Sequence, residues 1–375
     1  MINGRAIDSL GLLVGMIVGA GMFAIPYVVS RAGLLLGSIY LLLGVSVVAV
    51  LHTLYGEVVY VIKERHRLPG YARLCLGAYA GGLATFSMVF GFFGTLLAYG
   101  LLMGIFLQQL MGFGSAAINS LLFFVAAPFF LLFDLERVGF INFILTIPLL
   151  LFVFLLGLVA LPHIDFSDVP LINSAQWFLP YGVFLFSFSG AAAIPEIAEM
   201  LKKREGRLFE KIVFLGAIIP AVVYAVFMFA VVGVSGGATT SDAITGLKPF
   251  LGGNIVFLGA LIGLLAVFTS YLALGLDLRN ALSIDYKFGK ARSWLLIFIV
   301  PLLLFIIGAS NLIRVIGLVG GVMIGINGIL ILALARHIRK YYKHPKGFIP
   351  IGTVVPQVVM ALFALGIVWQ IFTAL

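Results

Sequence analysis

Apolar stretches of about 20 residues or more recur from one end of this chain to the other. A bilayer core holds no water, so each backbone group there must be hydrogen-bonded within the protein, and a single segment achieves this only as a helix. Of all residues, 63% are hydrophobic and only 10% are charged, whereas about 25% are charged in a soluble globule. We therefore predict an all-α integral membrane protein.

Eleven segments are long and apolar enough to cross a membrane as helices. They cover roughly residues 7–31, 33–62, 80–111, 115–134, 137–161, 177–201, 206–236, 254–284, 290–309, 311–339 and 349–374. No stretch between them is long enough for a separate soluble domain. The single cysteine, Cys75, excludes an internal disulfide.

Basic residues are distributed asymmetrically over the loops. If the N-terminus is cytoplasmic, all but three of the 23 Lys and Arg residues fall on the cytoplasmic side, the exceptions being Arg31, Lys248 and Arg314. The positive-inside rule then predicts a cytoplasmic N-terminus and, with eleven spans, an extracellular C-terminus in the plasma or inner membrane. The net charge of +9 is explained by this topology and by contact with anionic lipid, so no nucleic-acid partner is expected. The oligomeric state is not indicated.

The tripeptide Ala-Ile-Pro occurs twice, ending at Pro26 and at Pro195, 169 residues apart. Each copy closes a run of small residues that weakens a helix at membrane depth. Matched breaks in two halves of a chain mark the binding site of a transporter built from inverted repeats. We predict a first repeat of five helices over residues 1–161, an extracellular connector over 162–176, a second repeat over 177–340, and a C-terminal segment with one extra helix over 341–375.

The two breaks offer complements to an α-amino acid, which carries a carboxylate and an ammonium group close together. A helix beginning after the first break presents free N–H groups to the carboxylate, and these belong to Gly19, Ala20, Gly21 and Met22. Carbonyls that end the first half of the second broken helix can accept from the ammonium, and these lie around Phe186, Ser187 and Phe188. Because small residues leave room for the substrate, we expect Gly21→Val to abolish binding in a folded protein. The alternative is that single glycines only allow close helix packing.

Several motifs together resemble the aromatic and hydroxy amino acid permeases, within the amino acid, polyamine and organocation transporters of LeuT-type fold. They are Gly19-Ala20-Gly21-Met22 with Pro26, Phe86-Ser87-Met88 with Tyr99, Phe186-Ser187-Phe188-Ser189-Gly190 with Pro195, and Thr269-Ser270-Tyr271-Leu272 with Gly275-Leu276. The resemblance implies a secondary amino acid transporter that works by alternating access, with helices 1 and 6 discontinuous. Tyrosine- and tryptophan-type members often carry histidine in the helix 6 break, where this chain has Ser189, so an aromatic substrate is not specifically implied.

In that fold the substrate side chain faces helices 3, 6 and 8. The expected lining comprises Phe93 and Tyr99 on helix 3 and Phe188, Ser189 and Gly190 at the helix 6 break. No unpaired acidic or basic residue occurs at this level of the sequence. A neutral amino acid is therefore the predicted substrate.

The resemblance also implies a sodium site between helices 1 and 8. Its ligands would be carbonyls of Gly15, Val18 and Ala266 and hydroxyls of Thr269 and Ser270, an all-oxygen set that suits a hard cation. Some sodium-independent relatives place a lysine from helix 5 here, and residues 138–161 contain none. Sodium symport is favoured, although the two hydroxyls could instead bond to carbonyls of their own helix.

Proton coupling is the alternative, with His52, Glu57 and Glu196 as candidates because they are ionisable groups in or near the membrane. Glu196 could equally be a helix-starting residue, and Glu57 could pair with cytoplasmic cations.

Other classes of protein fit less well. An intramembrane enzyme would need a nucleophile with a base, or a metal cluster, and the sequence has no motif for either. A channel would need a polar lining. No cofactor is expected, and a transport-dead amino acid sensor remains an alternative.

Overall fold

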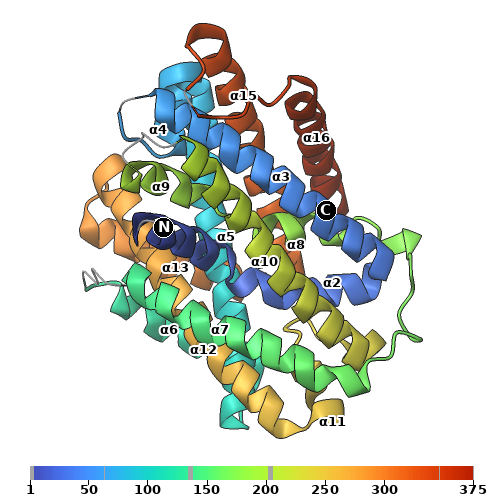
Figure 1. Cartoon of the computed structure of the whole chain (residues 1–375). Helices are drawn as coiled ribbons and strands as arrows, with labels where there is room; N and C mark the ends of the chain where they lie inside the picture. Colours follow the sequence, from blue (N-terminus) through green and yellow to red (C-terminus); the bar gives the residue numbers. More distant parts are fainter. Residues whose placement is uncertain (1–3, 63, 134–137, 202–205, 346, 375) are drawn as a thin grey trace.

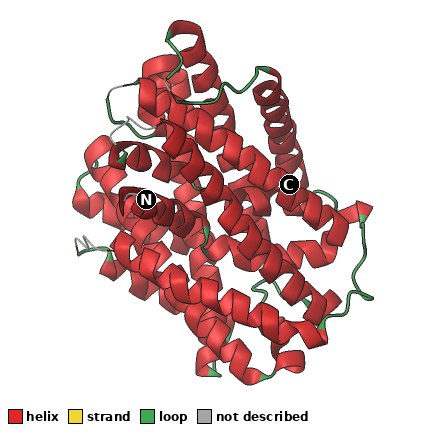
Figure 2. Ribbon diagram, in the orientation of Figure 1, coloured by secondary structure: helices red, strands yellow, loops and turns green. Residues whose placement is uncertain are grey.

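The computed structural model describes residues 4–62, 64–133, 138–201, 206–345 and 347–374. Figures 1 and 2 show that these ranges consist of helices joined by turns and loops, with no strand among them. The predicted all-α class is confirmed.

Sixteen α-helices are described, together with short 3₁₀ and π turns. The helices are α1 Gly4–Ile17, α2 Ile25–Ala32, α3 Leu34–Val61, α4 Leu68–Leu76, α5 Ala78–Met111, α6 Ala116–Phe130, α7 Val138–Ala160, α8 Leu179–Ser187, α9 Ile194–Met200, α10 Gly206–Ser235, α11 Lys248–Leu251, α12 Gly253–Asn280, α13 Lys290–Ile306, α14 Leu312–Leu318, α15 Gly325–Tyr341 and α16 Val354–Ala374.

Helices lie at all eleven predicted segments. In the described part of the chain, nine helical segments are long and apolar enough to cross a membrane. The other two, α6 and α13, have 15 and 17 residues and fall short of that length. The membrane class follows from the nine, and the full count of eleven spans stays a prediction.

Two of the long segments are broken in the same way. The first is interrupted after Ile17, passes through a 3₁₀ turn over Ala20–Ala24, and resumes as α2. The second is interrupted after Ser187, passes through a 3₁₀ turn over Ala191–Ala193, and resumes as α9. Each resumed helix has proline in its first turn, where the missing N–H costs nothing. The predicted discontinuity of helices 1 and 6 is confirmed.

Helix α5 runs through the middle of the bundle and packs against α6, α12 and α14, while α10 packs against α1, α2, α3 and α7 (Figure 1). The first break is anchored in this core by Phe23, whose ring meets Phe106 of α5 and Phe227 of α10 edge-on, with centroids 5.1 and 5.8 Å apart. The position of the break therefore depends on two central helices as well as on its own sequence.

The predicted connector lies against the turn between α2 and α3. Gly33 in this turn has a φ of 110°, and a side chain there would also lie 2.5 Å from the carbonyl oxygen of Leu171. The amide of Leu34 donates to Pro170 at 3.0 Å, and that of Asn173 donates to Ala32 at 2.7 Å. These backbone bonds hold the connector beside the end of the first broken helix.

Candidate functional site

The two breaks touch each other at Gly21. A Cβ at this position would lie 2.7 Å from the Cα of Ser187 and 3.0 Å from the Phe186 ring. Glycine is therefore required at position 21 for the backbones of the two breaks to come this close. A larger residue would push the second break away from the first. This contact argues against the expectation that Gly21→Val leaves a folded protein: the residue is a packing contact between the breaks.

Gly19 has a different environment. The nearest atom to a Cβ built there is Oγ of Ser270 on α12, at 3.9 Å, which is an ordinary contact. In the described residues, the N–H groups of Gly19 and of Gly190 donate to no backbone carbonyl. Each break thus contributes an amide donor outside the regular helical pattern, whereas the amide of Met22, also expected to be free, donates to the carbonyl of Gly19 at 3.2 Å.

Tyr224 of α10 joins the two broken helices. Its Oη lies 2.7 Å from the carbonyl oxygen of Ile17, the last residue of α1, and 2.7 Å from that of Ser187, the last residue of α8. The side chain is fully buried, and its ring meets Phe188 at 5.1 Å. Sequence reasoning missed this residue, although Tyr224 is the only polar side chain between Lys211 and Ser235.

His52 of α3 borders the second break. Its Cε1 lies 3.1 Å from the place that a Cβ of Gly190 would take, and Ile17 contacts the same place from the first broken helix. The imidazole is buried, and its Nδ1 has no hydrogen-bond partner in the described part of the chain. Of the three candidates for proton coupling, this is the one that the fold brings to the breaks.

The remaining predicted lining residues are divided between α5 and the second break. Phe93 and Phe186 are buried, while Tyr99 is half-buried. Ser189 is also half-buried, and its amide donates to Phe186 at 3.2 Å. Met22 and Ala20 are buried in the 3₁₀ turn of the first break.

Thr269 bonds to its own helix, which was the alternative left open by the sequence. Its Oγ1 lies 3.0 Å from the carbonyl oxygen of Leu265 and 3.1 Å from that of Ala266. This bond uses the proton of the hydroxyl and is compatible with its oxygen acting as a cation ligand. Gly15 and Val18 are buried where α1 ends, and Ser270 faces Gly19. The predicted ligands are all oxygens, the type of atom that a hard cation prefers.

Comparison with known proteins places the chain in a family. Residues 4–370 match the tryptophan/tyrosine permease family. The chain belongs to this family. One relative of the permease is glutamine transporter 2 of Aliivibrio fischeri (strain ATCC 700601 / ES114), which is 25% identical over 359 residues and covers 90% of each chain. The permease is a transporter and not an enzyme.

Two solved structures share the fold of the permease. MhsT in complex with L-phenylalanine matches with a TM-score of 0.70 at 13% identity and covers 98% of both chains. Mhp1, a nucleobase-cation-symport-1 family transporter in a closed conformation with bromovinylhydantoin bound, matches with a TM-score of 0.60 at 13% identity and covers 98% of this chain and 90% of its own. At such identity the likeness shows the fold alone, and it confirms the predicted LeuT-type fold.

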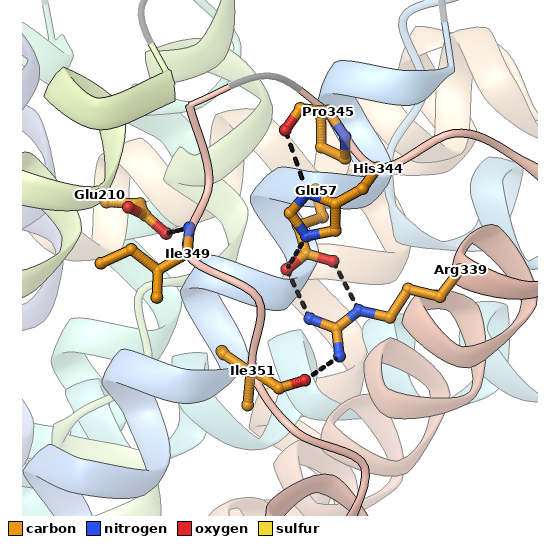
Figure 3. Close-up of polar contacts among 7 residues, drawn as sticks. All are labelled: Glu57, Glu210, Arg339, His344, Pro345, Ile349 and Ile351. Carbon is orange, nitrogen blue, oxygen red and sulfur yellow. Dashed lines mark hydrogen bonds and ion pairs between the residues drawn. The ribbon is translucent and has the colours of Figure 1, made fainter.

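Glu57 lies away from the breaks of the permease, in an ion pair with Arg339 of α15 (Figure 3). The carboxylate is fully buried and accepts from Nε and Nη2 of Arg339 at 2.8 and 2.6 Å, while Nε2 of His344 lies 3.7 Å away. Arg339 also donates to the carbonyl of Ile351 at 2.6 Å, and Glu210 accepts from a neighbouring amide in the same linker. This cluster fastens the α15–α16 linker to α3 and α10.

Glu196 also lies away from the site. Its side chain is more than half exposed and lies 3.8 Å from Arg65, which contacts Glu199 at 3.0 Å. Nearby, Arg67 pairs with Asp277 of α12. These pairs connect the α3–α4 loop to α9 and α12.

A cavity of about 1530 Å³ lies on the side of the permease that the charge distribution predicts to be extracellular. Its lining includes Tyr27 and Arg31 of α2, Trp177, Arg314 of α14 and Gln370 of α16, and the described lining residues include no Asp or Glu. The cavity therefore lies between the end of the first broken helix and α14.

Proposed function

We propose that this permease is a secondary active transporter of neutral amino acids that works by alternating access. The observation that carries the proposal is the contact of Gly21 with Ser187, which places both helix breaks at one point in the membrane. Amide donors of one break and carbonyl ends of the other then face a single substrate, and an α-amino acid needs both.

A neutral side chain is supported by the surroundings of the breaks. The residues that contact them include Phe186, Phe188, Tyr224 and Ser270, which are apolar or neutral polar, and the imidazole of His52; no Asp, Glu, Lys or Arg is among these contacts. Two similar proteins are described as a glutamine transporter and as a complex with L-phenylalanine, and both ligands are neutral amino acids.

Sodium symport is the proposed coupling. Ser270 of α12 lies beside the first break, and the adjacent Thr269 donates its hydroxyl proton to its own helix; hydroxyl oxygens are ligands that suit a hard cation. Coupling to protons is the second candidate, and the unpartnered Nδ1 of His52 at the second break supports it.

The proposed organisation follows the sequence: a first repeat over 1–161, a connector over 162–176, a second repeat over 177–340 and an added helix within 341–375. The N-terminus is placed in the cytoplasm and the C-terminus outside. In this orientation the ion pairs of Arg65, Arg67 and Arg339 close the cytoplasmic side, and the cavity beside Arg31 is the external entrance.

Uptake into proteoliposomes tests the function. The twenty labelled amino acids are offered under an inward sodium gradient and, separately, under an inward proton gradient. Accumulation of a neutral amino acid under sodium alone is the expected result. Accumulation under protons alone would transfer the coupling role to His52, and binding without flux under either gradient would favour a sensor.

A further inference from the structure

The hydroxyl of Tyr224 lies between two carbonyl oxygens and can donate to only one of them at a time. Both distances, to Ile17 and to Ser187, are 2.7 Å, which is a hydrogen-bond length for each. A phenol has one proton, whereas a carbonyl oxygen has only lone pairs. The three oxygens therefore share a single proton, and the cluster has acceptor capacity for a further donor.

The two carbonyls are also the ends of helix segments. Ile17 is the last residue of α1, and Ser187 is the last residue of α8. The C-terminal end of a helix carries partial negative charge, so two such ends directed at one point favour a positively charged donor. A hydroxyl supplies a proton but no charge.

We propose that Tyr224 positions the carbonyls of Ile17 and Ser187 to receive the ammonium group of the substrate. The inference rests on the proposed function and adds a residue to it. The hydroxyl holds the two helix ends at a fixed spacing, and the ammonium donates to the carbonyl that the hydroxyl leaves unpaired. Gly21, which touches Ser187, brings the amide donors of the first break to the same point, so both ends of an amino acid are accommodated.

The rings around the cluster support a fixed position for the hydroxyl. Tyr224 is fully buried, and Phe188, also fully buried, packs against its ring at an angle of 62°. The Phe188 ring is in turn confined by α3, because a Cβ on Gly44 would lie 2.9 Å from it. The tyrosine is held by packing, and its hydroxyl is not required to keep the ring in place.

The test compares ligands with and without the ammonium group in the Tyr224→Phe variant. The probes are L-glutamine with its deaminated analogue glutaramate, and L-phenylalanine with 3-phenylpropionate, each measured for binding to the purified full chain. We expect the preference of the variant for the amino acid over its analogue to be at least about tenfold smaller, since the two carbonyls that accept from the charged ammonium are no longer held at one spacing. Thermal unfolding without ligand is measured in parallel, and the variant is expected to remain folded with a modestly lower unfolding temperature, since one buried hydrogen bond is lost.

Tyr271→Phe is the matched control. Tyr271 of α12 is equally buried, and its hydroxyl has no hydrogen-bond partner in the described part of the chain, so its removal is expected to change neither preference nor stability. Equal loss of affinity for the amino acid and its analogue in Tyr224→Phe would overturn the proposal, as would failure of that variant to fold, because both indicate a purely structural hydroxyl.

Two further results separate this inference from the proposed function. A change in the sodium concentration required for binding, with the ammonium preference intact, would show that the cluster receives an alkali cation and would overturn the assignment to the ammonium. If the wild type itself binds neither amino acid and takes up none of the twenty, the proposed function fails first and this inference fails with it.

Discussion

Glu57 and Arg339 lie 282 residues apart in the sequence, yet they form two hydrogen bonds of 2.8 and 2.6 Å in the folded chain. The carboxylate is fully buried and the guanidinium is mostly so, with a side-chain exposure of 21%. A two-point contact of this kind is geometrically specific. It ties α3 to α15 and explains why an acidic residue can be accommodated at this depth.

Removal of Arg339 is expected to destabilise the protein strongly. Arg339→Ala leaves a buried carboxylate without its main partner, which costs roughly 3–5 kcal/mol, whereas the double variant with Glu57→Gln leaves no charge unpaired and loses less. Unfolding of the detergent-purified protein measures this. Arg65→Ala is the control, because that guanidinium is 62% exposed and its pairs contribute about 0–1 kcal/mol. Equal losses of stability in Arg339→Ala and Arg65→Ala would show that Arg339 is not the main partner of a buried carboxylate.

Alanine at Gly19 and alanine at Gly21 are expected to behave differently. The Gly21→Ala methyl would lie 2.7 Å from the backbone of Ser187, so this variant is expected to fold poorly or to separate the breaks. The Gly19→Ala methyl has its nearest contact at 3.9 Å, so this variant is expected to unfold at the wild-type temperature. Size-exclusion profiles and thermal unfolding distinguish them, and similar stability of both variants would show that the breaks are not in contact.

Replacement of Thr269 tests the cation site. Thr269→Ala removes an oxygen ligand, and we expect the sodium concentration for half-maximal uptake to rise about tenfold or more. Thr269→Ser keeps the hydroxyl and its bond to the helix, so it serves as the matched control. An unchanged sodium response in Thr269→Ala would exclude this side chain from the ion site.

Cys75 reports on topology because it is the only cysteine. With α4 on the cytoplasmic side, a membrane-impermeant maleimide is expected to label it in inside-out vesicles and not in right-side-out vesicles. Partial burial raises the pKa of the Cys75 thiol, so less thiolate is present at neutral pH and labelling is expected to accelerate as the pH rises.

Two variants control the labelling experiment. Cys75→Ser should give no signal in either vesicle preparation. Asp168→Cys in that background places a thiol in the exposed connector and should reverse the sidedness. Labelling of Cys75 from the outside would invert the proposed orientation.

The helix breaks could be located in the sequence because their causes are local. A longer run of Gly and Ala that ends in proline weakens a helix locally, whereas Pro148 of α7 and Pro220 of α10 lie within continuous helices. Both breaks end where Ala-Ile-Pro begins a new helix, as predicted. Their internal contacts were less predictable: Gly21 was expected to provide space for a substrate, and in the fold it provides space for Ser187.

The sequence by itself determined the membrane class, the helical fold and the two discontinuous helices, because hydrophobicity, the need to satisfy backbone groups in lipid, and proline geometry act within one segment. Only the tertiary structure decided that Glu57 pairs with Arg339, that Glu196 lies near the surface beside Arg65, and that the hydroxyl of Tyr224 joins two helix ends. Those contacts form only because folding brings side chains from distant segments within about 3–4 Å of each other. No local pattern in the chain encodes that pairing.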